Sequence, residues 1–142
     1  PLATEKSDDL KKQKEILLPE GNQENILLVE DEEDLLEMTT LMLEKLGYNV
    51  LAAREPGKAI RVADEYTGTI DLLITDVVMP GMNGRELYEK LNSSHKNIKC
   101  LFMSGYTGDV IAEHGVILEG VNFIQKPFFK KDLALKLREI LG

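Results

Sequence analysis

The feature of this sequence that most constrains its fold is a regular alternation of short apolar runs with stretches of helical periodicity. The apolar runs have the length of strands and span residues 26–29, 49–53, 72–75, 100–103 and 121–125. Short runs that are apolar on both faces are typical of strands buried in a parallel sheet. Because a helical pattern follows each run, the sequence predicts an α/β fold with a five-stranded parallel sheet covered by helices on both faces.

The segments between these runs carry helix start and stop signals. Leu35, Met38, Met42 and Leu46 recur at helical spacing, and Gly47 supplies a C-terminal stop. A second helix is predicted with Pro56 in its first turn and a buried stripe of Ala59, Val62, Ala63 and Tyr66. A third is predicted to run through Leu91, after the capping pair Asn83 and Glu86. A last amphipathic helix is indicated by Leu133, Leu137, Ile140 and Leu141. Residues 109–120 lie among glycines and predict only a short helix.

Residues 1–25 have a different character and are predicted to be a solvated linker, followed by one domain over residues 26–142. Lysines and acids are mixed there, and Pro19 and Gly21 interrupt any helix before the domain begins. A length of 142 residues fits one domain. The chain does not begin with Met, so we expect it to be part of a longer protein.

Charge and hydropathy exclude several classes of function. Acids outnumber bases 25 to 17, a formal charge of −8, which disfavours binding to nucleic acid or to an anionic membrane surface. The sequence contains no run of about 20 apolar residues, which is the length that a helix needs to span a bilayer. The single cysteine, Cys100, cannot form an internal disulfide, which fits a cytoplasmic domain and leaves open a membrane-anchored parent protein.

Polar side chains follow four of the five predicted strands. Glu30 and Asp31 end the first strand, Asp76 the third, Ser104 the fourth and Lys126 the fifth. The second strand ends in Ala53 and Arg54, with no acid. Ligands of open parallel sheets bind beyond the carboxyl ends of the strands, so we expect three acids, a hydroxyl and an ammonium to converge at one edge.

Together these groups predict phosphoryl chemistry. Three carboxylates at close range repel unless a cation lies among them, and oxygen ligands without His or Cys select a hard ion such as Mg²⁺. One carboxylate can then act as a nucleophile and form an acyl phosphate, while Lys126 and Ser104 offset part of the negative charge of the phosphoryl oxygens. Taken singly, each residue has a simpler interpretation. The acids Glu32, Glu33 and Asp34 are expected only to complement a helix dipole, Asp31 could do the same, Ser104 could belong to a turn and Lys126 to the surface.

The motifs that contain these residues resemble the receiver domain of two-component response regulators. The matching pieces are LVEDE at 28–32, DLLITDVVMPGMNG at 71–84, MSGY at 103–106 and FIQKPF at 123–128, and the resemblance extends over residues 25–141. It implies a flavodoxin-like (βα)5 three-layer sandwich with strand order 2-1-3-4-5.

The resemblance also implies a role for each residue of the site. Asp76 is implied as the phosphoacceptor and as a Mg²⁺ ligand. Asp31 is implied as a direct Mg²⁺ ligand, Glu30 as its partner acid through water, and Val78 as a backbone carbonyl ligand. By the same resemblance Ser104 and Phe123 are the switch residues, Lys126 is the counter-charge, and the Lys126–Pro127 peptide bond is cis.

This sequence departs from the family pattern at several positions. Glu30 stands where Asp is common, which favours contact with the metal through water, and Phe123 stands where Tyr is frequent, so it lacks a hydroxyl. Val78 and Tyr106 place apolar bulk beside the acceptor, and we hypothesise that they slow autodephosphorylation by impeding an attacking water. The family's usual output face is built from the fourth helix, the fifth strand and the fifth helix. The helix predicted over residues 109–120 is short, so this sequence departs from the family at that face.

The implied function is that of a phosphoaccepting switch in a two-component phosphorelay. The expected partners are a histidine kinase dimerisation and phosphotransfer domain or a histidine phosphotransfer protein, docked on the helix near residues 35–43; homodimerisation is left open. Residues 18–21 and 104–109 favour the C-terminal receiver of a hybrid sensor histidine kinase over a stand-alone regulator. Enzymatic activity beyond self-catalysed phosphorylation and dephosphorylation is left open. Two alternatives are a haloacid-dehalogenase-like Mg²⁺ phosphohydrolase, which would need an acid at position 78, and an FMN carrier, which would need a Ser/Thr-rich loop after the first strand.

Overall fold

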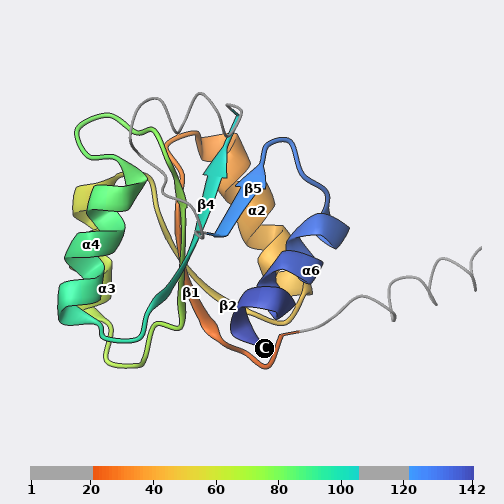
Figure 1. The fold of residues 1–142 in the computed structure, drawn as a ribbon, viewed down its shortest axis with the longest axis horizontal. Coiled ribbons are helices and arrows are strands. Elements are labelled where there is room, and N and C mark those ends of the chain that lie inside the picture. Colours follow the sequence, from red (N-terminus) through yellow and green to blue (C-terminus); the bar gives the residue numbers. More distant parts are fainter. Residues whose placement is uncertain (1–20, 106–121) are drawn as a thin grey trace, which may run out of the picture.

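The computed structural model describes residues 21–105 and 122–142, and these residues form a sheet between two pairs of helices (Figure 1). The strands are β1 (Asn25–Val29), β2 (Asn49–Ala53), β3 (Leu72–Asp76), β4 (Lys99–Ser104) and β5 (Asn122–Gln125), and the helices are α2 (Glu33–Lys45), α3 (Pro56–Glu65), α4 (Gly84–Ser94) and α6 (Lys130–Leu141). All neighbouring strands are parallel, in the order β2-β1-β3-β4-β5. The predicted α/β fold and its strand order are therefore confirmed. The short helix predicted at 109–120, Val121, Tyr106 and residues 1–20 lie outside the described part of the chain.

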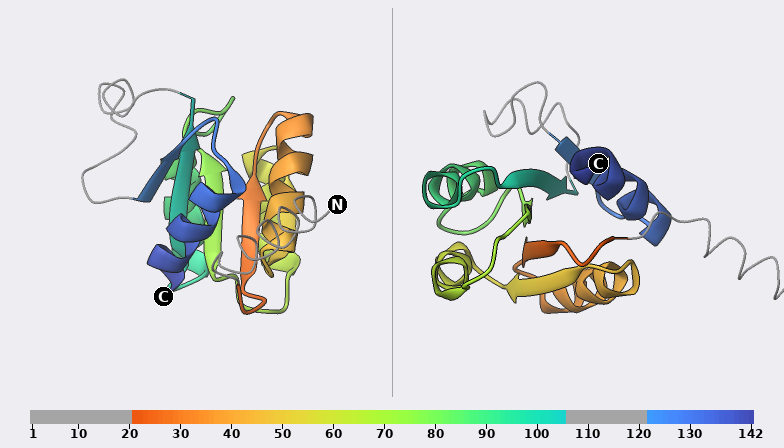
Figure 2. Two further views of the ribbon diagram at one scale, coloured as in Figure 1. Left: turned by 90° about the vertical axis from the view of Figure 1, so that its right-hand side faces the viewer. Right: turned by 90° about the horizontal axis from the view of Figure 1, so that it is seen from below.

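The apolar runs fill two cores, one on each face of the sheet. Successive side chains of a strand point to opposite faces, so Leu27 and Val29 pack towards α3 and α4, whereas Ile26 and Leu28 pack towards α2 and α6. Figure 2, seen from below, shows the two helix pairs on opposite sides of the sheet. Burial on both faces explains why these strands are continuously apolar instead of alternating.

The orientation of α2 differs from the one that its apolar spacing predicts. The buried residues of the helix are Leu36, Thr39 and Leu43. The predicted stripe lies to one side of them: Met38 is 48% exposed, while Leu35 and Met42 are half-buried. Of that stripe only Leu46, the C-cap residue, is fully buried. The spacing predicted the helix correctly. It could not show which side of the helix meets the sheet, because the position of the sheet is set by other parts of the chain.

Local signals at the other helix starts behave as their chemistry predicts. Pro56 occupies the first turn of α3, where the missing N–H has no partner to lose. The Asn83 side chain accepts a hydrogen bond of 2.8 Å from the Glu86 N–H at the start of α4. These caps fix where each helix leaves the sheet. None of the helices described within 21–105 and 122–142 has the length and apolar character that crossing a bilayer requires.

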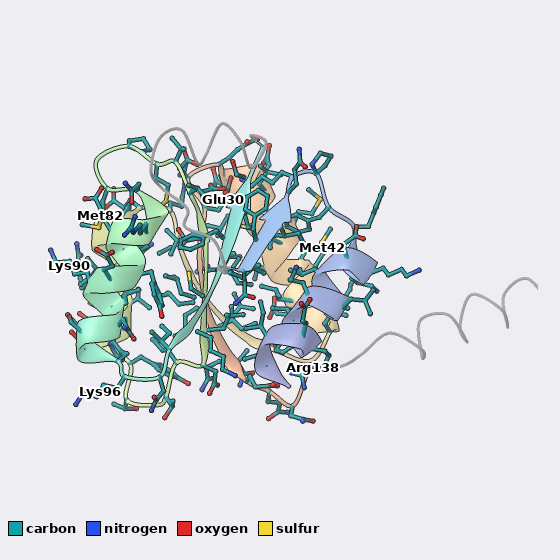
Figure 3. The ribbon with its side chains drawn as sticks, viewed as in Figure 1. Glu30, Met42, Met82, Lys90, Lys96 and Arg138 are labelled. Atoms are coloured by element: carbon teal, nitrogen blue, oxygen red, sulfur yellow. The ribbon has the colours of Figure 1, made fainter. Side chains whose placement is uncertain are left out.

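The segment that leads into β1 lies against the end of the sheet opposite the carboxyl ends of the strands. The Gly21 N–H donates to the Leu46 carbonyl at 2.6 Å and the Gln23 N–H to the Gly47 carbonyl at 2.8 Å. Figure 3 shows Arg138 at this end and Glu30 at the other. The chemistry predicted at the strand ends therefore lies at the edge away from this segment.

Candidate functional site

The predicted acidic residues meet in one pocket at the carboxyl edge of the sheet. This pocket, the acidic pocket, has a volume of about 170 Å³ and is lined by Glu30, Asp31, Glu32, Asp76, Val78, Met103, Ser104, Gly105 and Lys126. The side chains come from the ends of β1, β3 and β4 and from the residue after β5. The parallel topology thus joins residues that are up to 96 positions apart in the chain.

One ammonium group bridges two buried carboxylates that line the acidic pocket. Lys126 Nζ lies 2.8 Å from Glu30 Oε2 and 2.5 Å from Asp76 Oδ1. Glu30 and Asp76 are only 2% and 6% exposed, so neither carboxylate can rely on solvent to stabilise its charge. A single positive charge therefore serves two acids, which leaves the group one cation short.

That shortage appears in the protonation of Asp76. Burial raises the pKa of Asp76 to about 8, and the adjacent Glu30 carboxyl adds to the rise against the opposing effect of Lys126. Burial alone would lower the pKa of Lys126, but its bonds to Asp76 and Glu30 together outweigh burial and raise it. Two acids that share a site bind one proton between them. Near neutral pH and without a metal, Asp76 is therefore mostly protonated, and Lys126 keeps its charge.

The donor set of the acidic pocket fits a hard divalent cation. Carboxylate oxygens of Glu30, Asp31 and Asp76 lie within 4.8 Å of one another. Asp31 is exposed at the mouth of the pocket while the other two acids are buried. Oxygen ligands with one solvent-facing side match the preference of Mg²⁺ for a few carboxylates together with water. A cation there would supply the charge that the two buried acids lack.

The loop after β3 holds Asp76 by close backbone contacts. The Val77 N–H donates to the Met103 carbonyl at 3.0 Å, and the Gly84 N–H donates to the Val77 carbonyl at 2.8 Å. A Cβ atom at Gly84 would lie 2.3 Å from the Asp76 carbonyl oxygen. Only glycine lets the start of α4 approach the acceptor strand this closely. The glycine of the MNG motif therefore has a steric reason at this position.

The remaining predicted site residues fall at different distances from this chemistry. Ser104 is buried at the end of β4 and lines the acidic pocket, and Val78 lines it while 50% exposed. Phe123 is not among the described residues that line the pocket; it pairs with Phe102 across β4 and β5 and packs partly buried against the core beneath α3 and α4. The Lys126–Pro127 bond is cis, as expected from the resemblance.

Two features of this edge were not expected from the sequence. The Arg54 guanidinium, at the end of the strand without an acid, reaches back to the Asp31 carbonyl oxygen at 3.3 Å. An apolar cavity of about 280 Å³ also adjoins the acidic pocket and shares Glu30, Met103 and Lys126 with it. The sequence signal that could have indicated Arg54 is its position at the end of β2, because β2 lies next to β1, whose following loop carries Asp31.

The parallel sheet of order 2-1-3-4-5, with acids at two strand ends and a lysine after the last strand, defines the class of receiver domains. In agreement with this, residues 26–138 match the response regulator receiver domain family. The chain belongs to this family, whose members are phosphoacceptor domains of two-component signalling with histidine kinases as general partners.

Individual relatives support this assignment. Over 116 residues the chain is 36% identical to the sensor kinase CckA of Brucella abortus, covering 82% of this chain and 12% of that protein. It is 30% identical over 116 residues to the transcriptional regulatory protein CpxR of Escherichia coli, covering 82% of this chain and 48% of CpxR. The chain thus spans less than half the length of these curated relatives.

Solved structures show the same architecture. The receiver domain of the hybrid histidine kinase CckA is 36% identical with a TM-score of 0.70, and the match covers 83% of this chain and 99% of that domain. The chemotaxis protein CheY4 of Vibrio cholerae is 26% identical with a TM-score of 0.73, covering 84% of this chain and 99% of CheY4.

Proposed function

We propose that this domain accepts a phosphoryl group from a phosphohistidine onto the Asp76 carboxylate. Mg²⁺ would be held by Asp31 and Asp76, by Glu30 through water and by the Val78 carbonyl. The observation that carries the proposal is the convergence of three carboxylates within 4.8 Å around a lysine that contacts two of them. No other feature of the described residues places a nucleophilic oxygen, a candidate metal site and a fixed cation together. The domain is taken to run over residues 26–142, after a linker.

The chain's own residues divide the reaction among them. An ionised Asp76 oxygen attacks phosphorus, the P–N bond to the imidazole breaks, and an acyl phosphate forms. Lys126 contacts Asp76 and offsets negative charge as the phosphoryl group arrives. Mg²⁺ bound at the carboxylates would offset the charge of the phosphoryl oxygens. Ser104 and Phe123 are proposed to shift afterwards and change the population of surface states.

Labelling with acetyl phosphate and Mg²⁺ tests this function. We expect an acid-labile adduct of one phosphoryl group per chain, detected by mass spectrometry, which is absent in Asp76→Asn. Asp31→Asn should slow labelling, since it removes a proposed metal ligand and leaves the nucleophile in place. Steady release of phosphate from simple phosphate esters would instead favour the hydrolase interpretation, and the apolar Val78 at the position of its second acid argues against that outcome.

Slow loss of the phosphoryl group is a second part of the proposal. Val78 lines the acidic pocket with half of its surface exposed, so it occupies space that an attacking water would need. Val78→Asn replaces that bulk with an amide that can hold a water. We expect the half-life of the adduct to shorten, and an unchanged half-life would contradict the hypothesis.

The docking surface for the histidine donor is proposed to be α2 and the loop before α6. The apolar cavity beside the acidic pocket is lined by Leu35, Met38 and Met42 of α2 and by Pro127 and Phe128, and its residues Glu30 and Lys126 also belong to the acidic pocket. Figure 3 shows Met42 on the side of α2 near α6. An apolar side chain of the donor helix seated there would bring a neighbouring histidine to Asp76.

A charge placed in that cavity tests the docking surface. Met38→Asp should reduce the rate of transfer from a phosphorylated histidine phosphotransfer protein at least tenfold more than it reduces labelling by acetyl phosphate. Lys90→Glu, on α4 at the other face of the sheet, is the matched surface control (Figure 3). Equal loss in both assays would place Met38 in the acceptor chemistry and contradict the docking role.

The parent protein is proposed to be a hybrid sensor histidine kinase. The likeness to the sensor kinase CckA and to its receiver, at 36% identity in both comparisons, supports this context. Localisation would then be cytoplasmic for this domain. Sequencing the gene upstream of the Pro1 codon tests the proposal: kinase sequence is expected there, and an immediate start codon would favour a stand-alone regulator.

A further inference from the structure

Arg54 lies outside the acidic pocket, and its side chain holds the backbone of Asp31, a proposed metal ligand. Its Nη2 donates to the Asp31 carbonyl oxygen at 3.3 Å, and its Nη1 lies 4.0 Å from Glu33 Oε2. Arg54 directly follows β2, so its backbone position is fixed by the sheet. From there the side chain crosses to the loop that joins β1 to α2.

That loop has few other restraints. The Glu32 side chain makes no capping hydrogen bond at the start of α2, although side-chain caps usually fix such a junction. The Glu30 N–H donates to the Ala53 carbonyl at 3.1 Å. Two successive residues at the end of β2 therefore hold two successive residues of the loop: Ala53 holds Glu30 through the backbone, and Arg54 holds Asp31 through its guanidinium.

The acids of this loop also divide into two groups, those that could bind a metal and one that lies beside Arg54. Five acids follow one another from Glu30 to Asp34, yet the group of carboxylates that could hold a metal contains only Glu30 and Asp31 from this run. Glu33 instead lies beside Arg54. With both side chains more than half exposed, that ion pair contributes little by itself. The bond to the Asp31 carbonyl is the contact that bears on the metal site.

We propose that Arg54 is a positioning residue for metal binding, which orients the Asp31 carboxylate towards Asp76 by holding the Asp31 backbone. The inference rests on the proposed function, because it assumes that Asp31 binds Mg²⁺. Groups that orient metal ligands affect affinity without touching the metal. Arg54 is suited to this role because one nitrogen of its planar guanidinium donates to the Asp31 carbonyl in a fixed direction, a geometry that the ammonium of a lysine does not reproduce.

Two substitutions at Arg54 separate positioning from simple electrostatics. Arg54→Lys keeps the positive charge and loses the planar guanidinium, and Arg54→Gln loses the charge. Positioning predicts that both variants bind Mg²⁺ about three- to tenfold more weakly than the wild-type chain. Electrostatics alone predicts the opposite pattern, with unchanged affinity in the lysine variant and tighter binding in the glutamine variant, because a cation that repels Mg²⁺ has been removed.

The measurement is isothermal titration of the chain with MgCl₂ at constant pH and ionic strength, with ¹⁵N amide shifts of Asp31 and Glu32 followed in parallel. Glu33→Gln is the matched control: it removes the ion pair and keeps the bond to Asp31, so Mg²⁺ affinity should stay within about twofold. The metal-free unfolding free energy should be the same in the wild-type chain and the Arg54 variants, which a purely structural role would not predict.

The outcomes distinguish this inference from the proposed function. Wild-type affinity in both Arg54 variants, or the electrostatic pattern, overturns the positioning role and leaves the proposed function intact. A wild-type chain that binds no Mg²⁺, or binds it equally well as Asp31→Asn, overturns the metal site of the proposed function and the inference with it.

Discussion

At the scale of single residues, Asp76 is a buried acid that shares one lysine with a second buried acid. Its pKa in the folded chain is about 8, against about 3.9 for an unperturbed Asp in an unfolded chain. Between those two values the folded chain holds a proton that the unfolded chain releases. Stability of the metal-free domain therefore falls as the pH rises through this window, by up to about 1.4 kcal/mol per pH unit.

Asp76→Asn removes this dependence because the amide carries no ionisable proton. We expect the variant to be more stable than the wild-type chain near pH 8 without metal, and the difference to shrink as the pH is lowered towards 5. Urea unfolding followed by circular dichroism at several pH values in EDTA gives the measurement. Asp31→Asn, at the exposed acid of the same pocket, keeps Asp76. Its difference in stability from the wild-type chain should therefore not change with pH in this way. A constant difference between Asp76→Asn and wild type would be inconsistent with a proton held on the acidic pair.

Gly84 is a second residue whose identity matters, because even one added carbon atom would clash there. Gly84→Ala puts a methyl group 2.3 Å from the Asp76 carbonyl oxygen, so the backbone must shift, with an expected loss of about 1–3 kcal/mol in unfolding free energy. The rate of labelling of Asp76 should also fall, because the same shift moves the acceptor. Gly57→Ala in α3 is the control: nothing lies within 4 Å of its Cβ, and alanine favours a helix, so stability should be kept or gained. Equal effects of the two substitutions would refute the steric argument.

At the scale of elements, α6 is tied to the segment that enters β1 by a small polar cluster. Arg138 Nη2 donates to Glu24 Oε2, and Arg138 Nε donates to the Tyr48 hydroxyl at 3.2 Å. The guanidinium carbon also lies 5.7 Å from the centre of the Tyr48 ring. These contacts join the last helix, the start of β2 and the entering segment, which are distant in sequence.

Arg138→Ala should lower the unfolding free energy by about 1–2 kcal/mol, because it removes hydrogen bonds to a charged partner in a half-buried setting. Hydrogen exchange of the Gln23 amide should speed up in the variant, as the entering segment loses an anchor. Lys136→Ala on the same helix is the control: its partner Glu139 is exposed and lies 3.7 Å away, so the loss of this pair should cost less than about 0.5 kcal/mol. Similar losses for the two substitutions would show that Arg138 acts as an ordinary surface residue.

At the scale of the whole molecule, metal binding couples the carboxyl edge of the sheet to global stability. The candidate ligands Glu30 and Asp31 come from the loop after β1, and Asp76 comes from the end of β3. An unfolded chain cannot hold these residues together. Binding to the folded state alone stabilises it by about 2.7 kcal/mol at a Mg²⁺ concentration one hundred times Kd. The cation must also displace the proton held by Asp76, so the affinity for Mg²⁺ should depend on pH.

We expect Mg²⁺ affinity to rise with pH up to about pH 8, by as much as about tenfold per unit if one proton is released. Calorimetric titrations in buffers of different ionisation enthalpy will count that proton. Saturating Mg²⁺ should also flatten the fall in stability with pH, because the cation replaces the proton. Affinity that does not change between pH 6 and pH 8 would contradict a protonated acidic pair.

Most of the fold could be predicted because burial on both faces leaves a direct mark on each strand. The five runs were recognisable from their continuous apolar character, and Asn83 and Pro56 marked helix starts through local chemistry. The rotation of α2 could not be predicted, since Leu35 and Leu36 are both apolar and only the position of the sheet decides which of them is buried. Arg54 was missed because its partners are a backbone carbonyl and an acid more than twenty residues away.

The sequence by itself determined the fold class and the acids that meet at one edge, because a parallel sheet brings the carboxyl ends of all its strands together. Only the tertiary structure decided how those groups share charge. Burial and distance place one lysine between Glu30 and Asp76 and leave Asp31 facing solvent. Residue order specifies which groups arrive at an edge, but solvent exposure and separation set their protonation, and both exist only once the layers have packed.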